Sequence, residues 1–200
     1  MSFNVDLSDS TLYGRVIAHF YPADSPLRRL LLKHSSQVAA KALAIAVTLP
    51  AGSVDEYVVI NGAMLHDIGI KECHAPGILC YGDRNYICHG TIGADMLRKC
   101  AAEWGIDLEL YARICERHTG SGITADEVRI QALPLPVRDY LPETGEEKLI
   151  ALADKFFSKS GDMAEKPFGK VRRSMAKFGP ASLARFDELC ELFGVKENAG

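Results

Sequence analysis

Apolar residues recur along this chain mostly at intervals of three and four positions, and the strict alternation of a half-buried strand is almost absent. Spacing of this kind predicts amphipathic helices, whose ends are marked by glycine, proline and capping residues. The predicted helices cover residues 8–20, 26–49, 53–67, 89–104, 107–119, 124–133, 144–160, 169–178 and 181–193. The pattern therefore predicts an all-α fold.

Two of the predicted helix starts carry capping signals. Ser25 precedes Pro26, and a proline at the first helical position favours the start of a long helix there. Ser53 and Glu56 have the spacing of a capping box, so we expect Ser53 to cap the third helix. Between the third and fourth helices, residues 70–87 contain proline and glycine and predict an irregular loop.

The length of 200 residues fits one domain. We expect residues 1–24 to contribute an N-terminal helix and residues 25–160 to form a single helical bundle. Residues 161–200 are expected to form a C-terminal helical extension packed on the same domain.

The composition gives no indication of a membrane or nucleic acid partner. The net charge is −3, which is close to neutral. No apolar stretch approaches the roughly 18 residues that span a bilayer, and the first residues lack the basic start and apolar core of a secretory signal. We therefore expect a cytoplasmic protein with no membrane partner and no nucleic acid partner.

The six cysteines show no C-x-x-C pairing, so we expect reduced thiols rather than a disulfide framework. Cys73, Cys80 and Cys88 lie around the predicted loop, where a structural zinc site is conceivable. Their gaps do not match standard zinc-ligand spacing, and the sequence leaves their role open.

The adjacent pair His66-Asp67 closes an apolar helix, and further residues of metal-ligand type lie on other predicted helices. These further residues are His34, His89, His118 and Asp154. Ionised carboxylates and unpaired imidazoles are costly to bury, so such a cluster inside a core needs a cation or a partner network. Neighbouring residues diverge by about 100° within a helix, but at a helix end both can reach one ion. One or two divalent metal ions between helices explain the set economically.

Each of these residues also has an ordinary structural explanation. His34 could be a core histidine bonded to the backbone, and His118 could be a favourable cation near a helix C-terminus. His89 could be a capping or solvated residue, and Asp154 could pair with Lys155. Their occurrence together on five predicted helices favours a shared metal site.

The chain carries, in order, the motif residues of a known family: His34, the run His66-Asp67-Ile68-Gly69, and Asp154. In order and spacing they resemble the HD-domain metal-dependent phosphohydrolases, over about residues 27–159. This resemblance implies an all-α helical bundle with a metal site between helices, in which His34, His66, Asp67 and Asp154 bind the first metal.

Two further elements are His89-Gly90 with Gly93-Ala94, and Arg117-His118-Thr119-Gly120. They resemble the subset of HD proteins with two more histidines, similar to HD-type diadenosine tetraphosphate hydrolases. This resemblance implies that His89 and His118 hold a second metal, with Asp67 bridging. Imidazole and carboxylate ligands suit iron, manganese, zinc, cobalt or nickel. The expected cofactor is therefore one or two divalent ions of this group.

These inferences predict an enzyme that hydrolyses a phosphate ester or anhydride of a small molecule, with a nucleotide as the leading candidate, through a metal-activated water. Asp67 would orient the water. Lys71 and Arg84, on the neighbouring loop, are candidate phosphate contacts, although both also suit a solvated surface. A non-catalytic nucleotide-binding HD signalling module stays open, as does a di-iron oxygenase. The substrate and the oligomeric state, including a homo-oligomer, also stay open.

Overall fold

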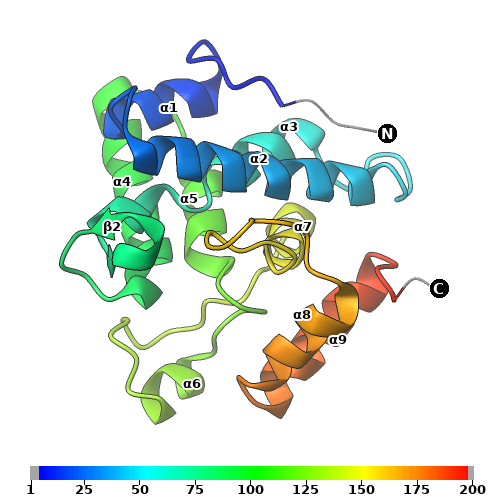
Figure 1. The fold of residues 1–200 in the computed structure, drawn as a ribbon. Helices are drawn as coiled ribbons and strands as arrows, with labels where there is room; N and C mark the ends of the chain where they lie inside the picture. The colour runs from blue at the N-terminus through cyan, green and yellow to red at the C-terminus, as the bar shows by residue number, and fades with distance from the viewer. Residues whose placement is uncertain (1–4, 198–200) are drawn as a thin grey trace.

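The computed structural model describes residues 5–197, which fold almost entirely into helices, with one short two-stranded hairpin at the edge of the bundle (Figure 1). The α-helices are α1 (Leu12–Phe20), α2 (Pro26–Ala46), α3 (Glu56–Leu65), α4 (His89–Trp104), α5 (Glu109–Arg117), α6 (Ala125–Ile130), α7 (Gly145–Asp154), α8 (Phe168–Ala176) and α9 (Pro180–Leu192). The strands are β1 (His74–Ala75) and β2 (Cys80–Tyr81), which pair antiparallel. The all-α prediction is confirmed.

Helix α3 lies at the centre of the bundle and contacts α1, α2, α5 and α7. Its side chains Val59, Ala63, Met64 and Leu65 have no exposed surface. The last turn of this helix is apolar on all sides, which is stable only when other helices enclose it, and α2, α5 and α7 supply that enclosure (Figure 1). The C-terminal end of α3 is therefore held inside the protein, at a fixed position relative to its neighbours.

The start of α3 differs from the prediction. Asp55, rather than Ser53, is the N-cap, and its carboxylate accepts hydrogen bonds from the backbone N–H groups of Tyr57 and Val58. The hydroxyl of Ser53 instead donates to the carbonyl oxygen of Pro50. The predicted capping box at Ser53 is wrong because two capping residues lie within three positions and the one nearer the helix satisfies its N–H groups.

Several helices end earlier than their hydrophobic pattern indicates. Helix α2 ends at Ala46, α3 at Leu65 and α7 at Asp154, where irregular backbone takes over. The predicted loop at 70–87 consists of short 3-10 turns (Ile68–Glu72, Pro76–Ile78 and Tyr86–Cys88) around the β1–β2 hairpin. Helix ends matter here, because the candidate ligands lie at or beside them.

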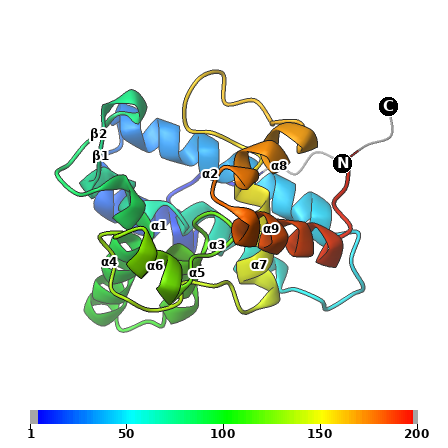
Figure 2. The ribbon, with the colours of Figure 1, turned by 90° about the horizontal axis from the view of Figure 1, so that it is seen from below.

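The C-terminal helices α8 and α9 pack against each other, and α9 contacts α7 (Figure 2). Near the start of α9, the hydroxyl of Ser121 donates to the carbonyl oxygen of Ser182 at 2.8 Å. This contact joins α9 to the segment that follows α5. Within residues 5–197, no helix combines the length and apolar character needed to cross a bilayer.

Candidate metal centre

His66 and Asp67 lie where α3 ends and the chain turns into the 3-10 segment Ile68–Glu72. Both side chains are fully buried. The turn is fixed from outside, because the hydroxyl of Tyr21 donates to the carbonyl oxygen of Ile68 at 2.7 Å. Nε2 of His66 lies 2.9 Å from Oδ2 of Asp67. The helix end therefore directs two adjacent ligand-type side chains to one point, as the sequence predicted.

His34 from the middle of α2 and Asp154 from the end of α7 complete a first group with this pair. Nε2 of His34 lies 3.0 Å from Oδ1 of Asp154 and 3.2 Å from Oδ2 of Asp67. Nε2 of His66 lies 3.6 Å from Oδ1 of Asp154. One ligand atom from each of the four residues lies within 4.8 Å of every other.

Asp67 also belongs to a second group, with His89 at the start of α4 and His118 at the end of α5. Oδ1 of Asp67 lies 3.4 Å from Nε2 of His89 and 3.6 Å from Nε2 of His118. The two carboxylate oxygens thus face different groups, Oδ2 the first and Oδ1 the second. All six predicted ligand residues meet in one place, and their role as ligands remains a prediction.

Backbone carbonyls orient three of the imidazoles. Nδ1 of His66 donates to the carbonyl oxygen of Ala63 at 2.6 Å, and Nδ1 of His89 donates to that of Tyr86 at 2.6 Å. Nδ1 of His118 donates to the carbonyl oxygen of Cys115 at 2.8 Å. A carbonyl only accepts, so Nδ1 carries a proton, and each ring presents its Nε2 lone pair to the cluster when that nitrogen is unprotonated.

The cluster fits a divalent cation. Nε2 of His89 and Nε2 of His118 are only 3.0 Å apart, and two lone pairs repel at that distance unless a positive charge lies between them. Within the described chain, Nε2 of His66 and Oδ1 of Asp67 are buried without a hydrogen-bond partner. Such atoms are costly to leave unpaired, and a bound cation would satisfy them.

The ionisation of the cluster indicates the same need for positive charge. Burial lowers the pKa of His66, but the Asp67 and Asp154 carboxylates outweigh it and raise that pKa to about 9. Burial and the neighbouring His118 lower the pKa of His89 to about 3. Burial acts to raise the pKa of Asp67, yet His66 and Lys159 hold it well below its ordinary value. The buried carboxylates therefore stay charged and draw compensating cations.

Two lysines supply such charge. Nζ of Lys159 lies 2.6 Å from Oδ2 of Asp67, and Nζ of Lys155 lies 2.8 Å from Oδ2 of Asp154. An ion pair between Asp154 and Lys155 was the structural alternative to a metal ligand in the sequence analysis, and the structure shows this pair within the cluster. Lys159 was missed. Its only sequence signal is its position four residues after Lys155, in the segment that leaves α7.

The other predicted phosphate contacts lie apart from this cluster. Nζ of Lys71 donates to the carbonyl oxygen of Phe20 at 3.1 Å. Arg84 is exposed, and its backbone pairs with Glu72 beside the hairpin. Among residues 5–197, neither side chain forms an ion pair or hydrogen bond with a ligand residue, and their phosphate role remains a prediction.

Two glycines permit the close approach of α4 to this site. A Cβ at Gly69 would lie 2.2 Å from the carbonyl oxygen of His89, and one at Gly90 would lie 2.4 Å from that of Cys115. Distances this short are incompatible with any side chain. Glycine at both positions therefore lets the start of α4 bring His89 to Asp67.

The cysteines take no part in the cluster. All six are buried and reduced, and in the part of the chain described here no candidate metal group contains a cysteine. Burial raises the pKa of the Cys73 thiol to about 12. A thiol with so high a pKa is a poor ligand, because metals bind the thiolate.

Two cavities open beside the cluster. One, of about 450 Å³, has His89 in its wall together with Thr119 and Gly120. The other, of about 470 Å³, is lined by Tyr86 and Lys159 among others. Both volumes fall in the range of roughly 300–1,000 Å³ that small-molecule sites occupy.

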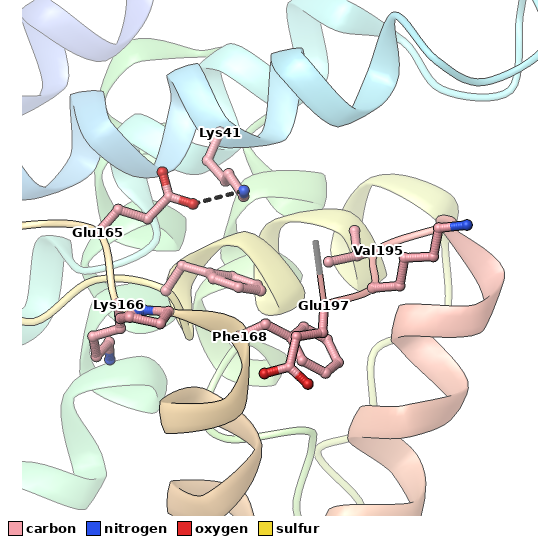
Figure 3. A pocket seen from close by; sticks show the side chains of 9 residues that line it. Lys41, Glu165, Lys166, Phe168, Val195 and Glu197 are labelled. Carbon is pink, nitrogen blue, oxygen red and sulfur yellow. Dashed lines mark hydrogen bonds and ion pairs between the residues drawn. The ribbon is translucent and has the colours of Figure 1, made fainter. Parts of the chain in front are cut away.

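A third pocket, of about 430 Å³, lies between α2, α8 and the C-terminal segment (Figure 3). There Nζ of Lys41 pairs with Glu165 at 2.7 Å, and Phe168 and Val195 form apolar wall. None of its lining residues belongs to the metal cluster. This pocket is therefore separate from the cluster.

Comparison with known proteins gives individual relatives and a matching family. A curated tRNA (cytidine(56)-2'-O)-methyltransferase of Picrophilus torridus is 40% identical over 129 residues, which are 64% of this chain and 32% of that protein. The enzyme of the same name from Thermoplasma volcanium is 37% identical over 128 residues, with the same shares. An uncharacterised protein of Methanocaldococcus jannaschii is 43% identical over 112 residues, 56% of each chain.

This chain thus spans about a third of the two methyltransferases and just over half of the third relative. No solved structure gives a significant match. The sequence profile of the HD domain matches residues 31–158, which include all six residues of the cluster. The chain belongs to the HD domain family.

Proposed function

We propose that this protein is a metal-dependent phosphohydrolase that cleaves a phosphate ester or anhydride of a small molecule, with a nucleotide as the preferred substrate. The observation that carries the proposal is the position of Asp67, whose two oxygens face two separate histidine groups at 3.2 Å and 3.4 Å. A carboxylate shared in this way is suited to hold two cations side by side.

His34, His66, Asp67 and Asp154 would hold one cation, and His89 and His118 with Asp67 a second. When bound, divalent cations lower the pKa of water and neutralise charge on phosphoryl oxygens. The protein contributes fixed geometry, because the Nδ1 hydrogen bonds to backbone carbonyls prevent the imidazole rings from rotating.

Lys159 gives the site a positive charge beyond the ligands. Its ammonium reaches Asp67 from the segment after α7, and its side chain is only 11% exposed. The same side chain lines the cavity that contains Tyr86. A buried ammonium at the wall of a cavity favours an anionic group there. The ring of Tyr86 stacks on His89 with centroids 4.8 Å apart and keeps water from that side of the ligand.

The two relatives named for methyl transfer to tRNA share about a third of their length with this chain. We therefore do not extend methyl transfer to this protein. The buried histidine and carboxylate cluster is instead a site for cations, and hydrolysis is the reaction that such a site supports best.

The test is phosphate release by protein stripped with a chelator and reloaded with manganese. Phenyl phosphate and the four common ribonucleoside 5′-monophosphates serve as substrates. We expect release that depends on manganese and that Asp67→Ala reduces to background, whereas Asp95→Ala, on the exposed face of α4, keeps full activity. Tight nucleotide binding without release, or oxygen consumption by iron-loaded protein, would overturn the proposal in favour of a signalling module or an oxygenase.

A further inference from the structure

The cavity of about 450 Å³ connects the ligand His89 with helix α9, which lies outside the residues that match the HD domain. Helix α6 and the α8–α9 pair lie on opposite sides of the lower end of the molecule (Figure 1). The lining residues come from both sides and from the segment after His118. The cavity is therefore built jointly by the HD domain and the C-terminal helices.

The walls of this cavity are largely apolar. Ile87 precedes His89 by two positions, Ile123 and Leu133 belong to segments that flank α6, and Phe178 comes from the turn between α8 and α9. Such a surface suits a planar group with apolar faces rather than a second phosphate.

Arg185 of α9 provides the principal cationic group in this wall. Its Nη2 donates to the carbonyl oxygen of Gly122 at 3.0 Å and to the carboxylate of Glu127 at 2.7 Å and 2.8 Å. Its side chain remains 20% exposed. Within residues 5–197 no hydrogen bond uses Nη1, so this amino group is left for a ligand.

The guanidinium is held at a fixed position relative to the metal cluster. Ser121, three positions after His118, donates to the carbonyl oxygen of Ser182, three positions before Arg185. Glu127 fixes the guanidinium from α6 and is itself bound to Thr124 through a capping box. Short chain segments therefore link the guanidinium to the ligand His118.

We propose that Arg185 is a specificity-determining residue, which donates a hydrogen bond to the base of a nucleotide whose phosphate lies at the metal cluster. The apolar walls would cover the two faces of the base, and every nucleobase has an acceptor atom in its plane. This inference rests on the proposed function and assigns the 450 Å³ cavity as the nucleoside subsite.

The experiment compares manganese-loaded wild-type protein with Arg185→Met. The substrates are the four ribonucleoside 5′-monophosphates, ribose 5-phosphate, which lacks a base, and phenyl phosphate. For wild type we expect at least one nucleotide to exceed ribose 5-phosphate in kcat/KM by about tenfold or more, and Arg185→Met to remove that advantage through KM. Activity on phenyl phosphate, whose ring has no acceptor atom for Arg185, is expected to persist and shows that the variant folds.

Arg172→Met is the matched control. Arg172 also forms a bidentate pair in the C-terminal helices, with Asp187 at 2.9 Å and 2.7 Å, but it lines neither cavity beside the ligands. We expect it to keep the nucleotide preference of wild type. An equal preference in Arg185→Met and wild type, or its loss in Arg172→Met alone, would overturn the assignment.

Binding of free nucleosides separates this inference from the proposed function. In metal-free protein, we expect a nucleoside to shift the backbone amide signals of Gly122 and Ile123, and Arg185→Met to abolish those shifts. Shifts without any phosphate release would refute the hydrolase and support the subsite. Phosphate release without shifts and without a nucleotide preference would refute the subsite and leave the hydrolase in place.

Discussion

Nζ of Lys159 lies 2.6 Å from Oδ2 of Asp67, the carboxylate shared by the two histidine groups. Asp67 is fully buried and Lys159 nearly so. The ammonium therefore supplies, within the chain itself, the positive charge that this carboxylate requires when no metal is bound.

Replacing Lys159 by methionine should destabilise the metal-free protein and tighten metal binding. Without the ammonium, Asp67 becomes a buried charge with less compensation, at a cost of about 3 kcal/mol in the free energy of unfolding. Urea unfolding in the presence of a chelator measures the first effect, and manganese titration by calorimetry the second. The control is Lys41→Met, which removes a surface pair with Glu165 and should change neither. Unchanged manganese affinity in the Lys159 variant would contradict the expectation.

The two histidine groups should be separable by metal content. We expect about two ions per chain in wild type. His89→Gln should lose the ion of the second group and His34→Gln the ion of the first, because each variant removes a ligand from only one group. Elemental analysis of the purified proteins measures the ratio. His19→Gln is the control, since His19 lies on α1 beside Glu103, away from the cluster. An identical ratio in wild type and His89→Gln would count against a second ion.

Acid should destabilise the protein partly through Glu116. Burial acts to raise the pKa of Glu116, but hydrogen bonds from Arg98 and Arg138 outweigh it and hold the pKa below the ordinary value of 4.5. Because the folded-state pKa is the lower one, the stabilising effect is present above pH 4.5 and is lost as the pH falls through that region.

Glu116→Gln should therefore be less stable than wild type at pH 7, by about 1–3 kcal/mol, and should lose less stability below pH 4.5. Thermal unfolding between pH 3 and pH 7 tests this, with the exposed Glu191→Gln as control. Parallel pH profiles for wild type and Glu116→Gln would show that the carboxylate has no such role.

The close approach at Gly69 should make this position intolerant of any side chain. A Cβ there would lie 2.2 Å from the carbonyl oxygen of His89 and 2.4 Å from the nitrogen of Gly93, so α4 would have to move away from the site. We expect Gly69→Ala to lower the free energy of unfolding by about 3 kcal/mol and to reduce metal content. Gly77→Ala has open space around its Cβ and is the matched control. Equal urea midpoints for the two variants would refute this account.

That these six residues lie together could be predicted from the sequence, because a charged or polar side chain within an apolar helix is costly and conspicuous. His34 and Asp154 stand in strongly apolar surroundings, and the pair His66-Asp67 stands at a helix end. Helix boundaries could be predicted from a different signal, the capping residues. Gly105 marks the end of α4 and Thr124 the start of α6, as the structure has them.

What could not be predicted depends on contacts between distant segments. Lys159 falls within the predicted helix 144–160 but lies in irregular chain after α7, and its charge gives no hint that it is buried against Asp67. Arg185 has the appearance of a solvated residue on an amphipathic helix, until α9 is placed beside Glu127. Sequence patterns describe each helix alone, whereas these roles arise only when the helices meet.

Asp154 follows His34 by 120 positions, yet their side chains touch. During synthesis the chain emerges from the ribosome with its N-terminus first. A growing polypeptide that already contains His34, His66 and His89 therefore still lacks Asp154, the last member of the first group. An ion held by all four residues of the first group could therefore bind only after translation has passed α7. The complete set of donor atoms would then act on the metals that the cell supplies at that moment.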